Sequence, residues 1–182
     1  MKVLFYALVF LVVAGLAHIL SLFAVPKLAR GDAFHWLAQD APIHAVAIVE
    51  PSRLRTSTHI DPNFALGVCR YDLSGGPVRI RVPLSESFTS VTFAELGTGV
   101  FASVSDRAAT GGSLDVVLAT PAQAAKIASL DEEDQVVEEL RIRAPRLRGL
   151  AILSVFIDRP SARERANATL TQARCDQESL PE

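Results

Sequence analysis

The chain has 182 residues, of which 49% are hydrophobic and 21% are charged. This balance excludes an intrinsically disordered polar chain, and the length predicts one domain with appendages. The net charge of -2 lacks the basic excess that nucleic-acid-binding proteins carry, so we expect no nucleic-acid partner.

An apolar stretch without formal charges covers residues 3–25 near the N-terminus. As a helix it would extend about 35 Å, which exceeds the roughly 30 Å hydrocarbon core of a bilayer. Pro26 is expected to end this helix. We therefore predict a transmembrane anchor over residues 1–26, with the lipid bilayer as its partner. A signal peptide cleaved at residues 15–17 is the alternative, but the apolar stretch continues well beyond that site.

One face of this predicted helix combines small residues with two hydrogen-bonding side chains. Its members are Ala14, Gly15, His18 and Ser21. Small residues allow membrane helices to approach closely, and a histidine inside a bilayer is a functional hypothesis by default. We predict that this face packs against another membrane helix.

The orientation of the anchor is weakly determined, because basic residues favour the cytoplasmic side and occur at both ends. Lys2 precedes the anchor, while Lys27 and Arg30 follow it. The two cysteines, Cys69 and Cys175, bear on the same question. Reduced thiols would suit a cytosolic domain, whereas a disulfide would suit an exported one. We favour an exported domain, and the sequence leaves the bonding of the two cysteines open.

After the anchor we expect a juxtamembrane segment over residues 27–44, with a short amphipathic helix at residues 31–39, and a β-rich domain over residues 45–182. Residues 78–82 alternate apolar side chains with arginines, which is typical of a half-buried strand. Short apolar stretches predict the strands at 45–49, 65–71, 78–82, 88–96, 99–104, 114–119, 136–142 and 150–157.

Two helices are expected among these strands. Residues 121–128 begin with a proline, which is favoured at the first helical position. Residues 160–174 have apolar side chains at helical spacing, with Asp158 or Ser161 as the N-cap, and we expect the tail beyond them to fray. The whole pattern predicts a mainly β fold, an antiparallel β-sandwich or jelly roll, with one N-terminal transmembrane helix and a C-terminal amphipathic helix.

The loop DRAATGG, residues 106–112, is the first candidate site. A phosphate-binding loop needs a lysine after its glycines and a helix behind it, and here a strand follows. A nucleophile elbow needs GxSxG, which is absent. We predict that Gly111 and Gly112 form the turn of a hairpin between the strands at 100–105 and 114–119. Asp106 and Arg107 would then lie at the surface of this bend.

The remaining polar residues give a weaker signal. His59 and Asp61 are two apart and would share a face of an extended segment. The alternative function is therefore an envelope hydrolase, with or without a metal, whose site a partner completes and which uses His44 or His59 with Asp61. We predict no metal, no cofactor and no catalytic residue. The acidic run at 131–134 is expected in a solvated turn. The four arginines between 141 and 148 are expected on an outer strand face, with Leu140 and Ile142 turned inward.

The stretch TSVTFAELGTGVFASVSDRAATGGSLDVVLATP, residues 89–121, resembles the core of the family called domain of unknown function 1254. The resemblance rests on a strand with an aromatic residue, a Thr-x-Val-Phe-Ala-Ser-like sequence, an arginine followed by a Thr-Gly turn, and a strand that ends in proline. These positions are Phe93, Thr98, Val100, Phe101, Ala102, Ser103, Arg107, Thr110, Gly111 and Pro121. The stretch CRYDLSGGPVRIRVP, residues 69–83, together with the anchor, resembles the short membrane-anchored members of alphaproteobacteria.

This resemblance implies a jelly-roll-like β module with no established activity. Larger members join it to a sister domain, numbered 1214, and this chain has no segment that resembles the sister. The resemblance therefore implies a separate sister β-domain protein as partner. We expect the pairing to use a sheet edge or the Arg107 loop, with Asp106, Arg107 and Thr110 as candidate contacts. The anchor and the expected export of the domain predict a location in the cell inner membrane with the soluble domain in the periplasm.

Overall fold

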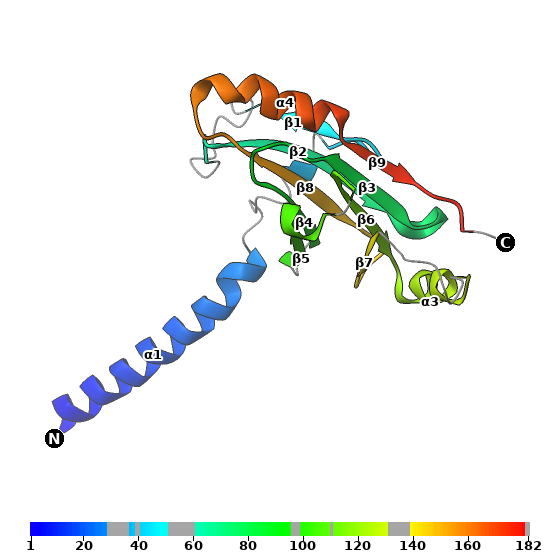
Figure 1. Cartoon of the computed structure of the whole chain (residues 1–182). Coiled ribbons are helices and arrows are strands. Elements are labelled where there is room, and N and C mark those ends of the chain that lie inside the picture. Colours follow the sequence, from blue (N-terminus) through cyan, green and yellow to red (C-terminus); the bar gives the residue numbers. More distant parts are fainter. Residues whose placement is uncertain are drawn as a thin grey trace.

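The computed structural model describes residues 1–28, 37–38, 41–50, 61–95, 99–109, 111–130 and 139–180. Helix α1 spans Lys2–Leu28 and extends away from the β-rich domain in Figure 1. It continues past Pro26, where we predicted its end, because a proline in the last turn removes only one backbone hydrogen bond. The segment Lys2–Val25 has a mean hydropathy of 2.6 and is not buried by the rest of the chain. Such a helix fits a membrane anchor and a signal sequence alike.

The strands of the described residues form two sheets. Sheet A has the order β1-β2-β8-β4-β5, and sheet B has the order β7-β6-β3-β9. In sheet A the strands are β1 (Ala47–Val49), β2 (Phe64–Asp72), β8 (Arg148–Phe156), β4 (Thr89–Glu95) and β5 (Gly99–Ser105). In sheet B they are β7 (Leu140–Arg143), β6 (Ser113–Ala119), β3 (Val78–Pro83) and β9 (Arg174–Gln177). The mainly β fold that the sequence predicts is therefore confirmed.

One pair differs from the predicted antiparallel arrangement, because β6 and β7 run parallel. Helix α3 (Pro121–Leu130) lies between them in the sequence. A helical crossover returns the chain to the end of the sheet where it started, so the next strand runs in the same direction. Leu140 lies opposite the core residue Val116, on the inner side as predicted, but remains 36% exposed because β7 is an edge strand.

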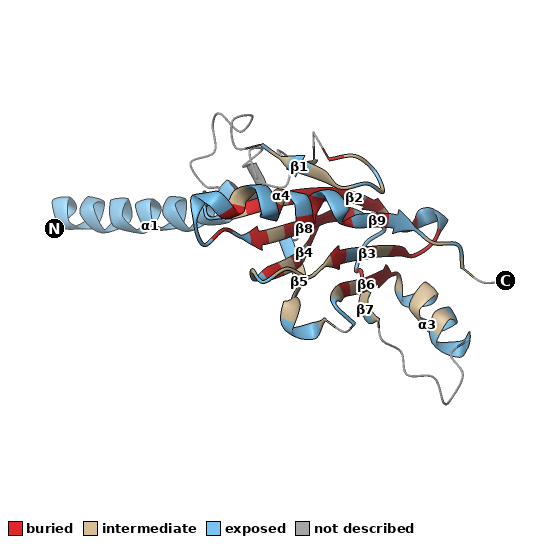
Figure 2. Ribbon diagram, turned by 45° about the horizontal axis from the view of Figure 1, so that its top comes forward, coloured by how far each residue is buried: buried red, intermediate tan, exposed pale blue. Residues whose placement is uncertain are grey.

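The core lies between the inner faces of the two sheets, where buried residues concentrate in Figure 2. Strand β3 shows the predicted alternation, since Val78, Ile80 and Val82 are fully buried while Arg79 and Arg81 point outward. The largest side chains of this core include Tyr71, Phe93, Leu114, Leu118 and Leu153. The alternation of side chains along each strand is what gives each sheet one apolar face.

The C-terminal segment departs from two predictions. Helix α4 (Arg163–Gln172) and the 3₁₀ turn before it lack a side-chain cap, so the predicted caps are wrong. The helix ends at Gln172, and the tail does not fray but forms β9 beside β3. Ile80 and Cys175 are paired in register, and Cys175 is buried, so the tail contributes a side chain to the core.

The predicted hairpin at Gly111–Gly112 is also wrong. Both glycines adopt the expected positive φ, 63° and 82°. However, β5 pairs with β4 in sheet A, while β6 pairs with β3 in sheet B. The connection therefore crosses from sheet A to sheet B.

Candidate functional site

The loop predicted to contact a partner lies directly after the edge strand β5. Asp106–Ala108 forms a 3₁₀ turn, η2, in which the Ala109 backbone N–H donates to the Asp106 carbonyl at 3.1 Å. Arg107 is exposed. Thr110 lies outside the described residues. Asp106 and Arg107 thus extend the end of β5, so the candidate surface includes the strand as well as the loop.

Strand β5 differs from the other edges of the described sheets. It has seven residues and no charge, and Val100 is 63% exposed. In contrast, β1 has three residues, and β7 and β9 have four residues each with charged side chains. Short or charged edges discourage pairing with another chain, whereas a long uncharged edge favours it. Strand β5 is therefore the least protected edge.

The direction of the β5 backbone follows from the pairing of its neighbours. The Phe88 carbonyl accepts a hydrogen bond from the Phe156 N–H at 2.9 Å, so even-numbered residues of β4 bond to β8. Odd-numbered residues of β4 then bond to β5, and their partners include Val104. The backbone N–H and C=O of Ser103 and the N–H of Ser105 consequently point away from β4, on the side where no described strand pairs with β5, while the Ser105 carbonyl begins the turn η2.

The outer face of sheet A beside this edge carries hydroxyl groups rather than charges. The Thr92 and Ser103 hydroxyls lie 3.0 Å apart. Ser90 lies between Ser154 on β8 and Ser105 on β5 in the strand register. This surface offers neutral hydrogen-bonding groups next to the free backbone of β5.

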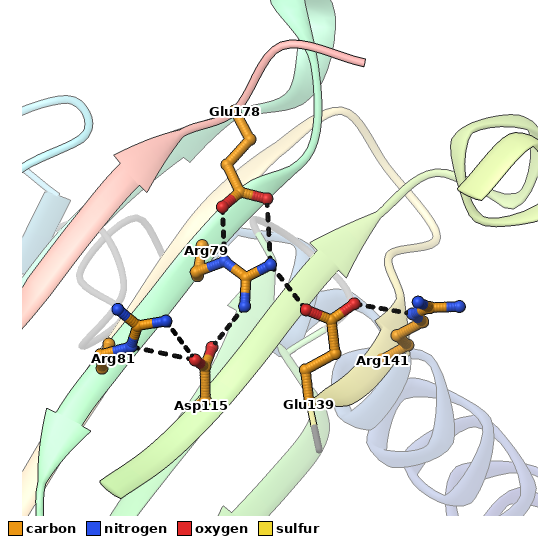
Figure 3. A network of polar contacts seen from close by, with 6 residues as sticks. All are labelled: Arg79, Arg81, Asp115, Glu139, Arg141 and Glu178. Atoms are coloured by element: carbon orange, nitrogen blue, oxygen red, sulfur yellow. Dashed lines mark hydrogen bonds and ion pairs between the residues drawn. The ribbon is translucent and has the colours of Figure 1, made fainter. Parts of the chain in front are cut away.

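A network of ion pairs lies on the outer face of sheet B, with Arg79 at its centre (Figure 3). Its guanidinium donates to Asp115 at 3.0 Å, to Glu139 at 2.6 Å, and to Glu178. Burial opposes the charge of Arg79, but the hydrogen bonds to Glu178 and Glu139 and the charge of Asp115 outweigh it and raise its pKa. Arg79 therefore stays charged, and its ion pairs connect β3 to β6, to the residue before β7 and to the C-terminal tail.

Two more arginines complete this network in Figure 3. Arg81 donates to Asp115 at 2.5 Å, and Arg141 donates to Glu139 at 2.9 Å. The six side chains drawn comprise three arginines and three carboxylates, so their charges balance. A groove of about 580 Å³ lies beside them, between Ile127 and Leu130 of α3 and the C-terminal tail. Because each of these charges is paired, the arrangement fits a structural network better than a catalytic one.

A second polar cluster lies inside one end of the sandwich. The Tyr71 hydroxyl is buried and has no hydrogen-bond partner among the described residues. Burial, and secondarily the charge of Glu95, raise the pKa of Tyr71, so it remains protonated. Glu95 is 1% exposed and accepts a hydrogen bond from the Arg146 backbone N–H at 2.8 Å. Gly149 lies opposite Tyr71, and a Cβ there would fall 2.3 Å from the hydroxyl.

Sequence reasoning missed both clusters. Glu95 carried a usable signal, since it continues the inward-facing series of Val91 and Phe93. Arg79 was placed on the correct face, but its three acidic partners come from distant parts of the sequence. No local pattern joins those positions.

The residues of the alternative hydrolase site are not brought together. The ring atom Nε2 of His44 lies 3.1 Å from the Asp72 backbone nitrogen, which donates to it. Asp61 precedes the other end of β2, so β2, about 26 Å long, separates the two residues. The pairing of His44 with Asp61 is therefore wrong, and His59 lies outside the described residues. Within the described ranges, no three His, Cys, Asp or Glu side chains gather as a metal site would need.

The structure joins Cys69 and Cys175 in a disulfide. Cys69 lies on β2 and Cys175 on β9, so the bond ties sheet A to sheet B inside the core. On α1, the Ser21 hydroxyl donates to the His18 carbonyl at 2.7 Å. All four residues of the predicted membrane face, which also includes Ala14 and Gly15, are exposed along that helix.

These features define a class of protein: a two-sheet β-sandwich with an apolar N-terminal helix in which, among the edge strands of the described residues, β5 is long and uncharged. The chain belongs to the family described as protein of unknown function (DUF1254), whose sequence profile matches residues 42–177. No curated protein is similar enough to this chain to count as a relative.

Two solved structures are similar in fold. The VPA0106 protein from Vibrio parahaemolyticus matches with a TM-score of 0.53 and 14% identity, over 80% of this chain and 34% of that protein. A putative uncharacterized protein from Burkholderia cenocepacia matches with a TM-score of 0.48 and 14% identity, over 78% of this chain and 38% of that one. This chain therefore spans little more than a third of the length of either.

Proposed function

We propose that the protein is a membrane-anchored assembly module whose β-sandwich binds a separate sister β-domain protein. The observation that carries this proposal is the edge strand β5, which has seven residues and no charged side chain. A long uncharged edge favours pairing with a strand of another protein.

The proposed location is the inner membrane of a bacterial cell, with the β-sandwich in the periplasm. The apolar helix α1 supports the anchor. The disulfide between Cys69 and Cys175 supports export, because such bonds persist in oxidising compartments and are rare in the cytosol.

Two surfaces are proposed to take part. One is the end of β5 with Asp106, Arg107 and the neighbouring Thr110. The other is the membrane face of α1 around His18, whose imidazole would need a hydrogen-bonding partner in the bilayer. An interaction through both surfaces would gain strength from the shared anchor, because the second contact becomes intramolecular.

A pull-down of the full-length protein from detergent-solubilised native membranes tests the proposal. We expect mass spectrometry to identify one β-domain protein in a near-stoichiometric amount. The control is the same preparation without the tagged bait. A monomeric preparation that binds no such protein at low and moderate salt would refute the assembly function.

A further inference from the structure

The partner must satisfy the free backbone groups of β5, and this requirement sets its chemistry. Ser103 directs its N–H and C=O, and Ser105 its N–H, toward the open edge, as the pairing of β4 with β8 and β5 dictates. The repeat of these groups along an edge matches only the backbone of another extended segment. Side chains or headgroups do not reproduce that spacing.

The charge distribution around the edge restricts the partner further. Strand β5 has no charged residue, and the adjacent outer positions of β4 and β8 present Ser90, Thr92 and Ser154. A charged partner strand would lose hydration here without gaining an opposite charge. Val100, 63% exposed, adds an apolar contact at the start of the edge.

We propose that the partner adds an uncharged β-strand to β5 and so extends sheet A. This inference rests on the proposed function and specifies the interface that the two proteins use. The other edges of the described sheets are short or charged, which directs the added strand to β5. Asp106 and Arg107 then lie at the end of the added strand and limit its register.

Substitutions at Ser103 separate the backbone from the side chain. Ser103→Pro removes the outward N–H but leaves the β4–β5 hydrogen bonds, because those use Val104 and not Ser103. Ser103→Ala is the matched control, since it removes only the hydroxyl. Val100→Lys places a charge on the edge, and Ala125→Lys places the same charge on the exposed surface of α3 as its control.

The experiment compares partner recovery by the full-length variants from native membranes. We expect Ser103→Pro and Val100→Lys to reduce recovery about tenfold or more, while Ser103→Ala and Ala125→Lys retain it. Hydrogen exchange should show protection of the Ser103 and Ser105 amides only in the complex. Recovery by the wild type should change little between about 0.1 and 1 M salt, because the hydrogen bonds along β5 join uncharged groups.

The outcomes distinguish this inference from the proposed function. If the wild type recovers a β-domain partner and all four variants recover it equally, the interface lies elsewhere and the strand addition is wrong. If the wild type recovers no such partner, the assembly function itself fails. Thermal melts of each variant show whether a substitution unfolds the domain. If it does, protection of the Ser103 and Ser105 amides from hydrogen exchange in the wild-type complex tests the strand addition without any substitution.

Discussion

Removal of the disulfide between Cys69 and Cys175 tests whether the bond carries the stability that its position indicates. Replacing both residues by alanine removes the disulfide that links sheet A to sheet B. The two positions are 106 residues apart in sequence. Both are buried, at 0% and 1% exposed.

The expected loss follows from the length of the closed loop. In the chain-entropy model, a cross-link over this separation stabilises the folded state by about 5 kcal/mol. Single domains have a free energy of unfolding of about 5 to 15 kcal/mol, so the loss is a large fraction of the total. For a domain of this size it corresponds to a fall in melting temperature of about 15 °C.

The assay is thermal unfolding of the full-length protein in detergent, followed by near-ultraviolet circular dichroism with and without reductant. We expect reductant to lower the melting temperature of the wild type and to leave Cys69→Ala/Cys175→Ala unchanged. The tail should also lose protection from proteolysis, because β9 would be held by noncovalent contacts alone, among them its pairing with β3 and the Arg79–Glu178 ion pair. An unchanged wild-type melting temperature after verified reduction would contradict the reasoning.

Three further predictions concern the polar clusters. Arg79→Ala should destabilise the domain by about 2 kcal/mol in chemical denaturation, because the largely buried carboxylates of Asp115 and Glu139 each lose one of two arginine partners. Arg81→Ala, at a more exposed position, should change stability by less than about 1 kcal/mol. Gly149→Ala should lower the melting temperature by the clash of its Cβ with the Tyr71 hydroxyl, and Tyr71→Phe should relieve part of that loss in the double variant. Hydrogen bonds from Ser74, and to a lesser degree Arg148, lower the pKa of Asp72 to about 2. The ionised Asp72 therefore stabilises the fold above its unfolded pKa near 4, and this stabilisation disappears as the pH falls toward 2. The melting temperatures of Asp72→Asn and the wild type should converge over that range, and a constant difference would argue against this contribution.

Local patterns in the sequence identified most of the strands. The alternation in β3 placed Val78 and Ile80 inward and Arg79 outward, because side chains of a strand point alternately to its two faces. The apolar N-terminal helix was identified by its length and composition. These signals depend only on neighbours along the chain, so they can be recognised without knowledge of the fold.

Pairing between strands was predicted less well, because it depends on distant segments. The glycines at 111 and 112 correctly indicated a bend, but the pattern did not reveal that β5 and β6 belong to different sheets. The polar tail around Cys175 gave no strand signal, and its position follows from pairing with Ile80 and from the bond to Cys69. Long-range contacts of this kind compensate for weak local propensity.

The candidate interface shows the same division. The sequence alone determined that β5 is an uncharged strand followed by Asp106 and Arg107, and that the chain carries an apolar helix. Only the tertiary structure decided that β5 is an edge and that the Ser103 backbone faces outward. The physical reason is that composition and alternation are properties of a single strand. Which of its backbone N–H and C=O groups remain free depends instead on the neighbouring strand and on the register in which the two strands pair.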